Sequence, residues 1–82
     1  MRIDSEQGTR ELFMTRIAVE TEQEVDGRWI SEIPELPGVL AYGDTREEAI
    51  AKSEALALRV LAERLDNGED VPELLGLFAV AP

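Results

Sequence analysis

The chain has 82 residues, with 18 acidic and eight basic residues that give a formal net charge of -10, and it contains neither cysteine nor histidine. This length predicts a single small domain, and the composition excludes disulfides and the usual Cys/His zinc sites. The acidic balance also argues against direct binding to nucleic acid, because phosphate backbones are bound by clustered lysine and arginine.

The chain begins with a polar stretch over residues 1–13, which has no clear periodicity. We expect a flexible N-terminal arm there. A single domain then covers residues 14–82. Apolar residues that alternate with polar ones predict its first strand over residues 16–25, because side chains of a strand point to opposite faces in turn.

A hairpin follows the first strand. The Asp26-Gly27 pair predicts a type I′ turn, which requires positive φ at both central residues. The second strand is predicted over residues 28–33, with Trp29, Ser31 and Ile33 on one face.

Two turn signals separate the second strand from the third. Pro34 ends the second strand because it cannot donate a ladder hydrogen bond. The Pro37-Gly38 pair predicts a type II turn, since proline fixes φ at the first central position and glycine accepts positive φ at the second. The third strand is predicted over residues 39–42.

A long helix is predicted over residues 45–67. Thr45 and Glu48 have the spacing of a capping box, and the Asn67-Gly68 pair is typical of a helix end. A short fourth strand is predicted over residues 77–80, which are apolar. The fold class is therefore α+β, a single β-β-β-α-β domain with an antiparallel sheet and one long helix packed on one face.

The run from the second strand into the helix resembles the signature of the HicB family of antitoxin-like domains. The resemblance covers roughly residues 15–68. Its elements are an acidic residue and Leu-Pro-Gly after a first proline, then Gly-Asp-Thr, then an acidic pair and alanine; here these are Pro34, Glu35, Leu36, Pro37, Gly38, Gly43, Asp44, Thr45, Glu47, Glu48 and Ala49. The chain differs at Val39, where many members carry cysteine.

The resemblance implies a truncated ribonuclease H-type fold and a non-catalytic role. Members of the family bind and neutralise a small basic RNA-cleaving toxin by covering its active surface. The alternative is a stand-alone oligomeric domain of the same family that binds a small molecule or regulates another protein, with no toxin partner. An acidic surface is complementary to a basic protein in either case.

Catalytic chemistry has little support in this sequence. Histidine, the commonest general base, is absent. The carboxylates of Glu20, Glu22 and Glu24 share one strand face and could hold a metal ion, but a solvated outer face explains the same spacing. We expect no enzyme, no metal site and no cofactor.

The candidate partner-binding residues are Trp29, Glu32, Glu35 and Tyr42, together with the acids of the first strand. Trp29 is either a core residue or an interface anchor, since tryptophan is enriched at binding hot spots. Tyr42 is either packed or in contact with a partner.

The sequence also carries expectations about self-association and about location in the cell. Leu58, Leu61 and Leu65 widen the apolar arc of the helix, either as ordinary core or as a self-association seam. A short chain without disulfides gains from association, so a homo-oligomer, a dimer or tetramer, is expected. No run of about 18 apolar residues occurs, so neither a membrane span nor membrane binding is expected, and a cytoplasmic location is the default.

Overall fold

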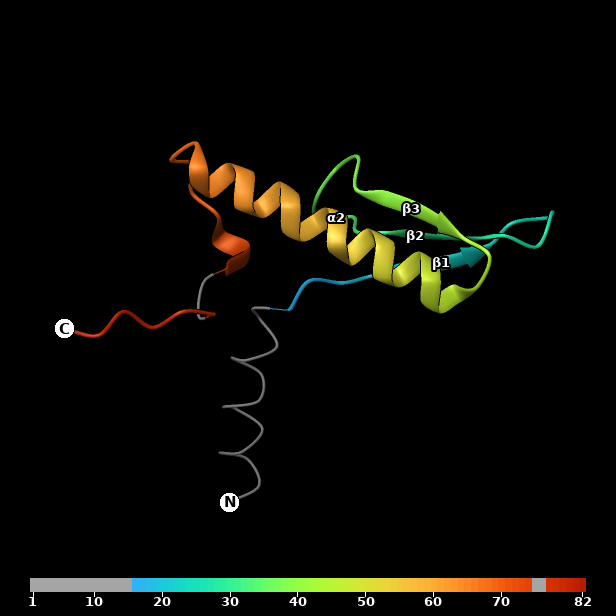
Figure 1. Ribbon diagram of the computed structural model, residues 1–82, viewed down its shortest axis with the longest axis horizontal. Coiled ribbons are helices and arrows are strands. Elements are labelled where there is room, and N and C mark those ends of the chain that lie inside the picture. The colour runs from blue at the N-terminus through green and yellow to red at the C-terminus, as the bar shows by residue number, and fades with distance from the viewer. Residues whose placement is uncertain (1–15, 75–76) are drawn as a thin grey trace, which may run out of the picture.

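The computed structural model describes residues 16–74 and 77–82, so the predicted arm over residues 1–13 lies outside the described part of the chain. The element order is β1 (Glu20–Gln23), β2 (Trp29–Glu32), β3 (Leu40–Gly43), the helix α2 (Arg46–Asp66) and the 3-10 helix η1 (Pro72–Leu74) (Figure 1). A three-stranded antiparallel sheet followed by one long helix confirms the α+β prediction.

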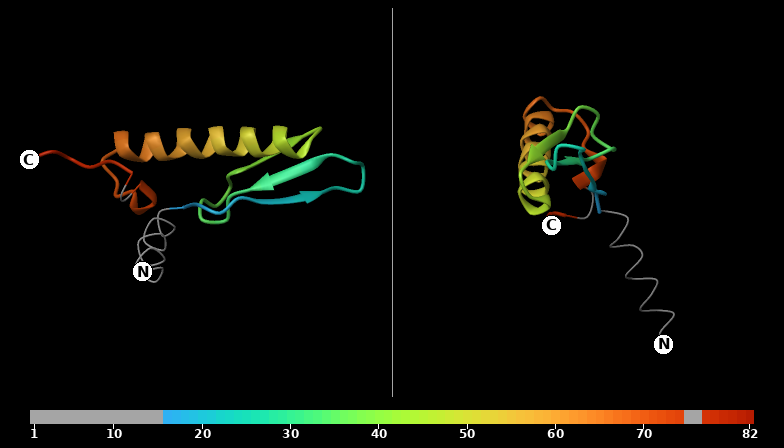
Figure 2. Two further views of the ribbon diagram at one scale, coloured as in Figure 1. Left: turned by 90° about the horizontal axis from the view of Figure 1, so that it is seen from below. Right: turned by 90° about the vertical axis from the view of Figure 1, so that its right-hand side faces the viewer.

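The sheet and the helix form two layers. The strands lie in the order β1-β2-β3, and α2 packs along one face of them (Figure 2). All three strands are shorter than or displaced from the predicted ranges. Ile17 and Val19, which precede β1, nevertheless pack against the core cluster. Among the described residues, neither helix is long and apolar enough to cross a membrane.

The hairpin between β1 and β2 is present, but its predicted turn type is wrong. Gly27 has a φ of 94°, and no described residue other than glycine has positive φ, so Asp26 does not meet the type I′ requirement. The Gly27 N–H donates to the Glu24 carbonyl (2.9 Å), and the Glu24 N–H donates to the Arg28 carbonyl (2.7 Å). This is the pattern of a turn followed by one left-handed glycine. Asp26 keeps its negative φ while its carboxylate accepts from the Arg28 N–H (3.0 Å).

The segment between β2 and β3 is built from two successive turns. The Leu36 N–H donates to the Ile33 carbonyl (2.9 Å), and the Val39 N–H donates to the Leu36 carbonyl (3.0 Å). Gly38 has a φ of 87°, as the predicted type II turn at Pro37-Gly38 requires. Leu36 lies between the two turns and is completely buried, so the loop contributes a core residue.

The N-terminus of α2 carries the predicted cap. The Thr45 hydroxyl accepts from the Glu48 N–H (3.0 Å), and the Glu48 carboxylate accepts from the Asp44 N–H (2.6 Å). The return bond thus reaches one residue further back than in the usual capping box. At the other end, Asn67 caps the helix, which confirms the predicted stop.

This cap makes stability depend on pH in the acid range. Hydrogen bonding from the Asp44 N–H, and then the nearby Lys52 charge, hold the pKa of Glu48 below its usual value of 4.5. The stabilisation is therefore complete above pH 4.5 and is lost as the pH falls through the lowered folded-state pKa.

We expect Glu48→Gln to reduce the free energy of unfolding at pH 7, with a difference from wild type that shrinks below pH 4.5. Glu47→Gln is the matched control, because it removes the same charge from the same helical turn without touching the cap. Urea unfolding between pH 3 and pH 7 measures both. A difference for Glu48→Gln that is constant over this range would contradict the assignment.

One stripe of α2 faces the sheet: the buried residues Ala49, Ser53, Ala57 and Leu61. Small residues on this stripe bring the helix close to the strands. Ser31 of β2 lies with its Oγ 2.7 Å from Ser53 Oγ, and both serines are completely buried. Ser53 Oγ also donates to the Ile50 carbonyl (3.0 Å), so the pair leaves no hydroxyl proton without an acceptor.

The predicted fourth strand over residues 77–80 is not formed. Residues 77–82 have no strand assignment, and Leu77, Phe78 and Val80 are exposed. Apolar composition predicted a strand there, but a strand also needs a neighbour that completes its hydrogen bonds, and the described sheet has three strands.

Candidate protein-binding face

The side of the sheet opposite α2 has no described element packed on it. Ser31 contacts Ser53 of the helix, so its neighbours Ile30 and Glu32 point to the other side. The strand register extends this assignment to β1 and β3. We call this surface the open face and define it by six residues: Glu20, Glu22, Ile30, Glu32, Leu40 and Tyr42.

Acidic side chains occupy the β1 side of the open face. Glu20 lies directly opposite Glu32, and Glu22 lies directly opposite Ile30. Both members of the Glu20–Glu32 pair are exposed. Like charges directly opposite each other on a sheet destabilise it. A cation placed between these two carboxylates would relieve that repulsion.

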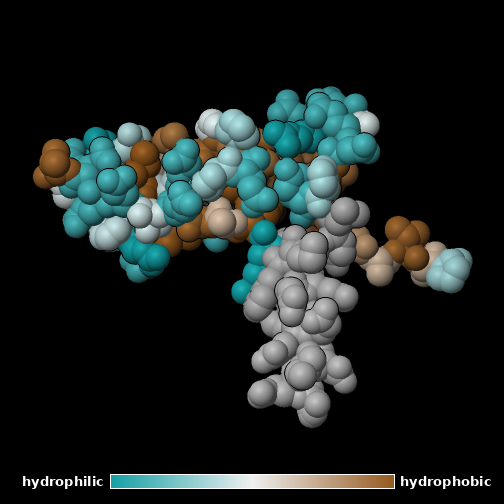
Figure 3. Space-filling model, turned by 180° about the vertical axis from the view of Figure 1, so that it is seen from behind, coloured by the Kyte–Doolittle hydropathy of each residue, from teal (hydrophilic) through white to brown (hydrophobic). Residues whose placement is uncertain are grey.

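Apolar side chains occupy the β3 side of the same face. Tyr42 lies opposite Ile30, and Leu40 lies opposite Glu32. Tyr42 and Leu40 are 42% and 39% exposed. Viewed from the side of the sheet, the molecule shows hydrophilic surface interrupted by apolar patches (Figure 3). The open face thus combines an acidic edge with a partly exposed apolar strip.

The hairpin places one cation beside this strip. The guanidinium carbon of Arg28 lies 4.8 Å from the centroid of the Tyr42 ring, within the range of a cation–π interaction. Arg28 Nε also donates to Asp26 Oδ2 (2.9 Å). The Arg28 backbone N–H and, to a lesser extent, its guanidinium group lower the pKa of Asp26. Arg28 is therefore already engaged by Asp26 and Tyr42.

The structure separates the four predicted binding residues into three places. Glu32 and Tyr42 share the open face. Trp29 pairs with Gly43 in the register and lies, half-buried, on the face turned toward α2. Glu35 is exposed in the first turn of the loop between β2 and β3.

Two apolar members of the open face, Ile30 and Leu40, were not predicted as binding residues. The available signal was parity, because Ile30 is two residues before Glu32, and Leu40 is two residues before Tyr42. Knowing that Leu40 lies opposite Glu32 also required the register between β2 and β3.

Metal binding is the other chemistry that an acidic strand suggests. Within residues 16–74 and 77–82, no three acidic side chains are arranged to hold a metal ion. Glu20 and Glu22 lie within β1, and both side chains are exposed on the open face.

Comparison of the chain with protein-family models, with curated proteins and with solved structures found no match.

Proposed function

We propose that this chain is a non-catalytic, HicB-like antitoxin-type protein that binds and neutralises a small basic RNA-cleaving toxin in the cytoplasm. The observation that carries the proposal is the open face, where Glu20 and Glu32 lie directly opposite each other. The family signature over residues 34–49 supplies the identity of the partner class.

The composition of the open face favours a protein as the partner. Its carboxylates attract lysine and arginine, and its apolar strip of Ile30, Leu40 and Tyr42 offers surface that a folded partner can desolvate. Interfaces of this kind combine an apolar centre with a polar rim. An RNA-cleaving enzyme needs a basic surface to hold the phosphates of its substrate. The acidic edge is complementary to that surface.

Neutralisation then follows from occlusion alone. When the open face covers the basic surface of the toxin, RNA cannot reach it. Complementary charge accelerates the encounter, and the apolar contacts slow dissociation. The inhibitor acts stoichiometrically and needs no catalytic residue.

A second candidate function retains the fold but has no toxin partner. A stand-alone oligomeric domain is favoured by the small core. The buried apolar residues of the described chain are Ile33, Leu36, Val39, Ala49, Ala57 and Leu61. The neighbouring reading frame discriminates between the two functions. A short basic protein with a single histidine, encoded beside this chain, supports the toxin partner.

Inhibition of RNA cleavage tests the proposal. If the neighbouring reading frame encodes a short basic protein, that protein is purified and incubated with single-stranded RNA and increasing amounts of this chain. We expect cleavage to stop near one equivalent. We expect the Glu20→Lys/Glu32→Lys variant to require at least tenfold more protein, because it reverses both opposed charges. Absence of inhibition by the folded wild-type chain contradicts the proposal.

A further inference from the structure

The outer side of β3 has no neighbouring strand among the described residues. The sheet order is β1-β2-β3, so β3 is an edge strand (Figure 1). The Ile33 N–H donates to the Val39 carbonyl (3.0 Å), which makes these two residues a hydrogen-bonded pair of the β2–β3 ladder. Hydrogen-bonded and non-hydrogen-bonded pairs alternate along an antiparallel ladder. The backbone groups of Ala41 therefore face β2, whereas those of Leu40 and Tyr42 face outward.

This edge is open to pairing with another strand. Natural proteins usually protect an edge strand with charged side chains, with proline or with a covering element. The four residues of β3, Leu40–Gly43, include no charge and no proline. Within the described part of the chain, no turn or loop hydrogen bond reaches the backbone of Leu40 or Tyr42. The outward N–H and carbonyl groups are thus a template for a further strand.

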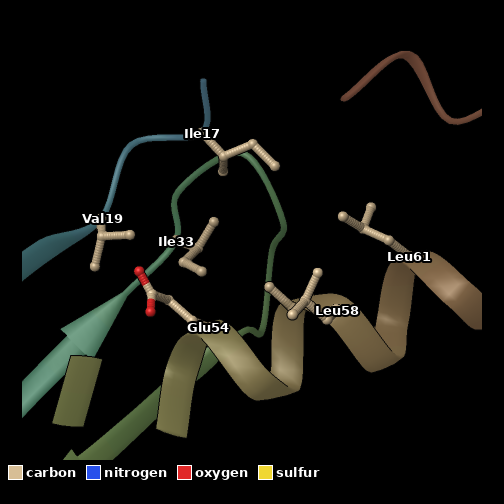
Figure 4. Close-up of a pocket in the computed structure, with 7 residues that line it drawn as sticks. Ile17, Val19, Ile33, Glu54, Leu58 and Leu61 are labelled. Carbon is tan, nitrogen blue, oxygen red and sulfur yellow. The ribbon is translucent and has the colours of Figure 1, made fainter. Parts of the chain in front are cut away.

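The opposite edge of the sheet is unsuited to a second copy. β1 carries Glu20 and Glu22, and Arg46 of α2 donates from Nε to Thr21 Oγ1 (3.1 Å). A groove on the same side, between α2 and the segment that leads into β1, also includes a carboxylate, that of Glu54 (Figure 4). Two copies that met through β1 would place like charges next to each other, which destabilises a sheet.

We propose that two copies of this chain pair through β3, antiparallel across a two-fold axis at Ala41, and form one sheet with three strands from each copy. In this register Leu40 lies opposite Tyr42 of the second copy, and Tyr42 lies opposite its Leu40. Both residues face outward, so their N–H and carbonyl groups complete an antiparallel ladder. The contact is the same surface on both copies, as a closed two-fold dimer requires.

The side chains of β3 fit this register. Leu40 and Tyr42 are 39% and 42% exposed, and each becomes the direct cross-strand neighbour of the other residue type. Pairs of an aromatic and an apolar side chain in this position stabilise a sheet. Ala41 meets its own counterpart in a non-hydrogen-bonded pair, where side chains come closest and a small residue fits. The strands pair in the plane of the sheet, so the open face of each copy stays uncovered.

Charge complementarity selects a second copy as the occupant of this edge. Glu32, which lies opposite Leu40, is exposed and forms no ion pair with another described residue. Arg28 lies with its guanidinium carbon 4.8 Å from the centroid of the Tyr42 ring. Its Nε donates to Asp26, and its Nη groups can donate to a second carboxylate.

The proposed register brings these two charges together. Tyr42 of the second copy lies one strand beyond Leu40, so it is two strand spacings, roughly 10 Å, from Glu32 at the backbone. The guanidinium above that ring then comes within reach of the Glu32 carboxylate. Two-fold symmetry forms the same pair twice. A second copy therefore supplies the cation that Glu32 lacks, although each copy has a formal net charge of -10.

Cross-linking at position 41 tests the register, and the chain has no native cysteine. Ala41→Cys places two thiols opposite each other at the two-fold axis. Thr21→Cys is the matched control, because Thr21 and Ala41 flank Ser31 in one row of the sheet and both are half-buried. We expect the disulfide-linked dimer to form at least about tenfold faster for Ala41→Cys, because association raises the effective thiol concentration. Equal rates would overturn the proposal.

Solution mass tests the backbone pairing. The interface is small, so we expect wild type to dimerise with a dissociation constant in the micromolar range. Leu40→Pro removes an outward N–H that the chain's own sheet does not use, and proline is tolerated at such edge positions. It should raise the dissociation constant about tenfold more than Leu40→Ala, which keeps the N–H. A wild-type chain that stays monomeric at millimolar concentration would leave this edge to a strand of another protein and overturn the proposal.

Exchange of the two charges tests the choice of partner. Glu32→Arg and Arg28→Glu each place like charges together in their own dimers, so each variant alone should raise the dissociation constant about tenfold. In an equimolar mixture both ion pairs form again with reversed polarity. We expect the mixture to form heterodimers with a dissociation constant within about threefold of wild type. A mixture that dimerises no better than the separate variants would contradict pairing through Glu32 and Arg28.

Discussion

Leu36→Ala should lower the free energy of unfolding by about 3–4 kcal/mol, the cost typical of a leucine removed from a completely buried site. Leu36 is buried between the two turns that join β2 to β3, and both turns use its backbone groups. The substitution leaves the turns intact and creates a cavity beneath them. Because small domains have only a few kcal/mol of net stability, a large fraction of the variant should be unfolded at 25 °C.

Leu40→Ala is the matched control for this prediction. It removes the same atoms, but from a side chain that is 39% exposed on the open face, so it should cost about 1 kcal/mol or less. Urea unfolding followed by circular dichroism gives both values. Equal losses for the two variants would mean that the loop is not part of the core.

Gly43→Ala should cost about 3 kcal/mol for a different reason. A Cβ at position 43 would lie 2.5 Å from the backbone nitrogen of Ala49 and 3.0 Å from the Thr45 carbonyl oxygen. Backbone atoms at a helix N-terminus cannot move aside as a flexible side chain can. The added methyl group must therefore push β3 away from α2, with a cost typical of an overpacked core.

Gly68→Ala provides the comparison for Gly43→Ala. Gly68 has a φ of 76°, but a Cβ there would meet nothing within 4 Å. The cost is then conformational strain alone, about 1 kcal/mol. Thermal unfolding of both variants should show the larger loss at position 43. A reversed order would contradict the close contact between β3 and α2.

The ends of the long helix could be predicted from the sequence because they depend on local chemistry. Thr45 and Glu48 form their cap within four residues, and Asn67 ends the helix beside Gly68. The turn at Pro37-Gly38 is local in the same sense. The hairpin was predicted, but its turn type was not, because the Asp26 side chain could bond to Arg28 without the positive φ that the predicted turn required.

The remaining features depend on contacts between distant residues. Nothing local marks Leu36 as a core residue within a loop of prolines and glycine. The pairing of Glu20 with Glu32 requires a register that a one-residue shift would destroy. Trp29 faces α2 while Tyr42 faces away from it, although both were predicted as binding residues. The fourth strand was predicted from composition, which does not specify the strand that it would pair with.

The central claim is that the open face binds a basic protein. Binding kinetics test it most directly, with a short basic protein from the neighbouring reading frame as the proposed partner. Association rates are measured at several salt concentrations for wild type, Glu32→Lys, Glu35→Lys and Glu63→Lys. Exposed charges are screened more strongly as salt rises, because the Debye length shortens and reaches about 8 Å at physiological ionic strength. Wild-type association should therefore slow with salt.

We expect Glu32→Lys to slow association at least tenfold at low salt, because it reverses the charge at the centre of the open face. Glu35→Lys, on the adjoining loop, should have a smaller effect. Glu63→Lys, exposed on α2, should stay within about twofold to threefold of wild type. Salt-independent association of the wild-type chain, or equal losses from Glu32→Lys and Glu63→Lys, would contradict the account.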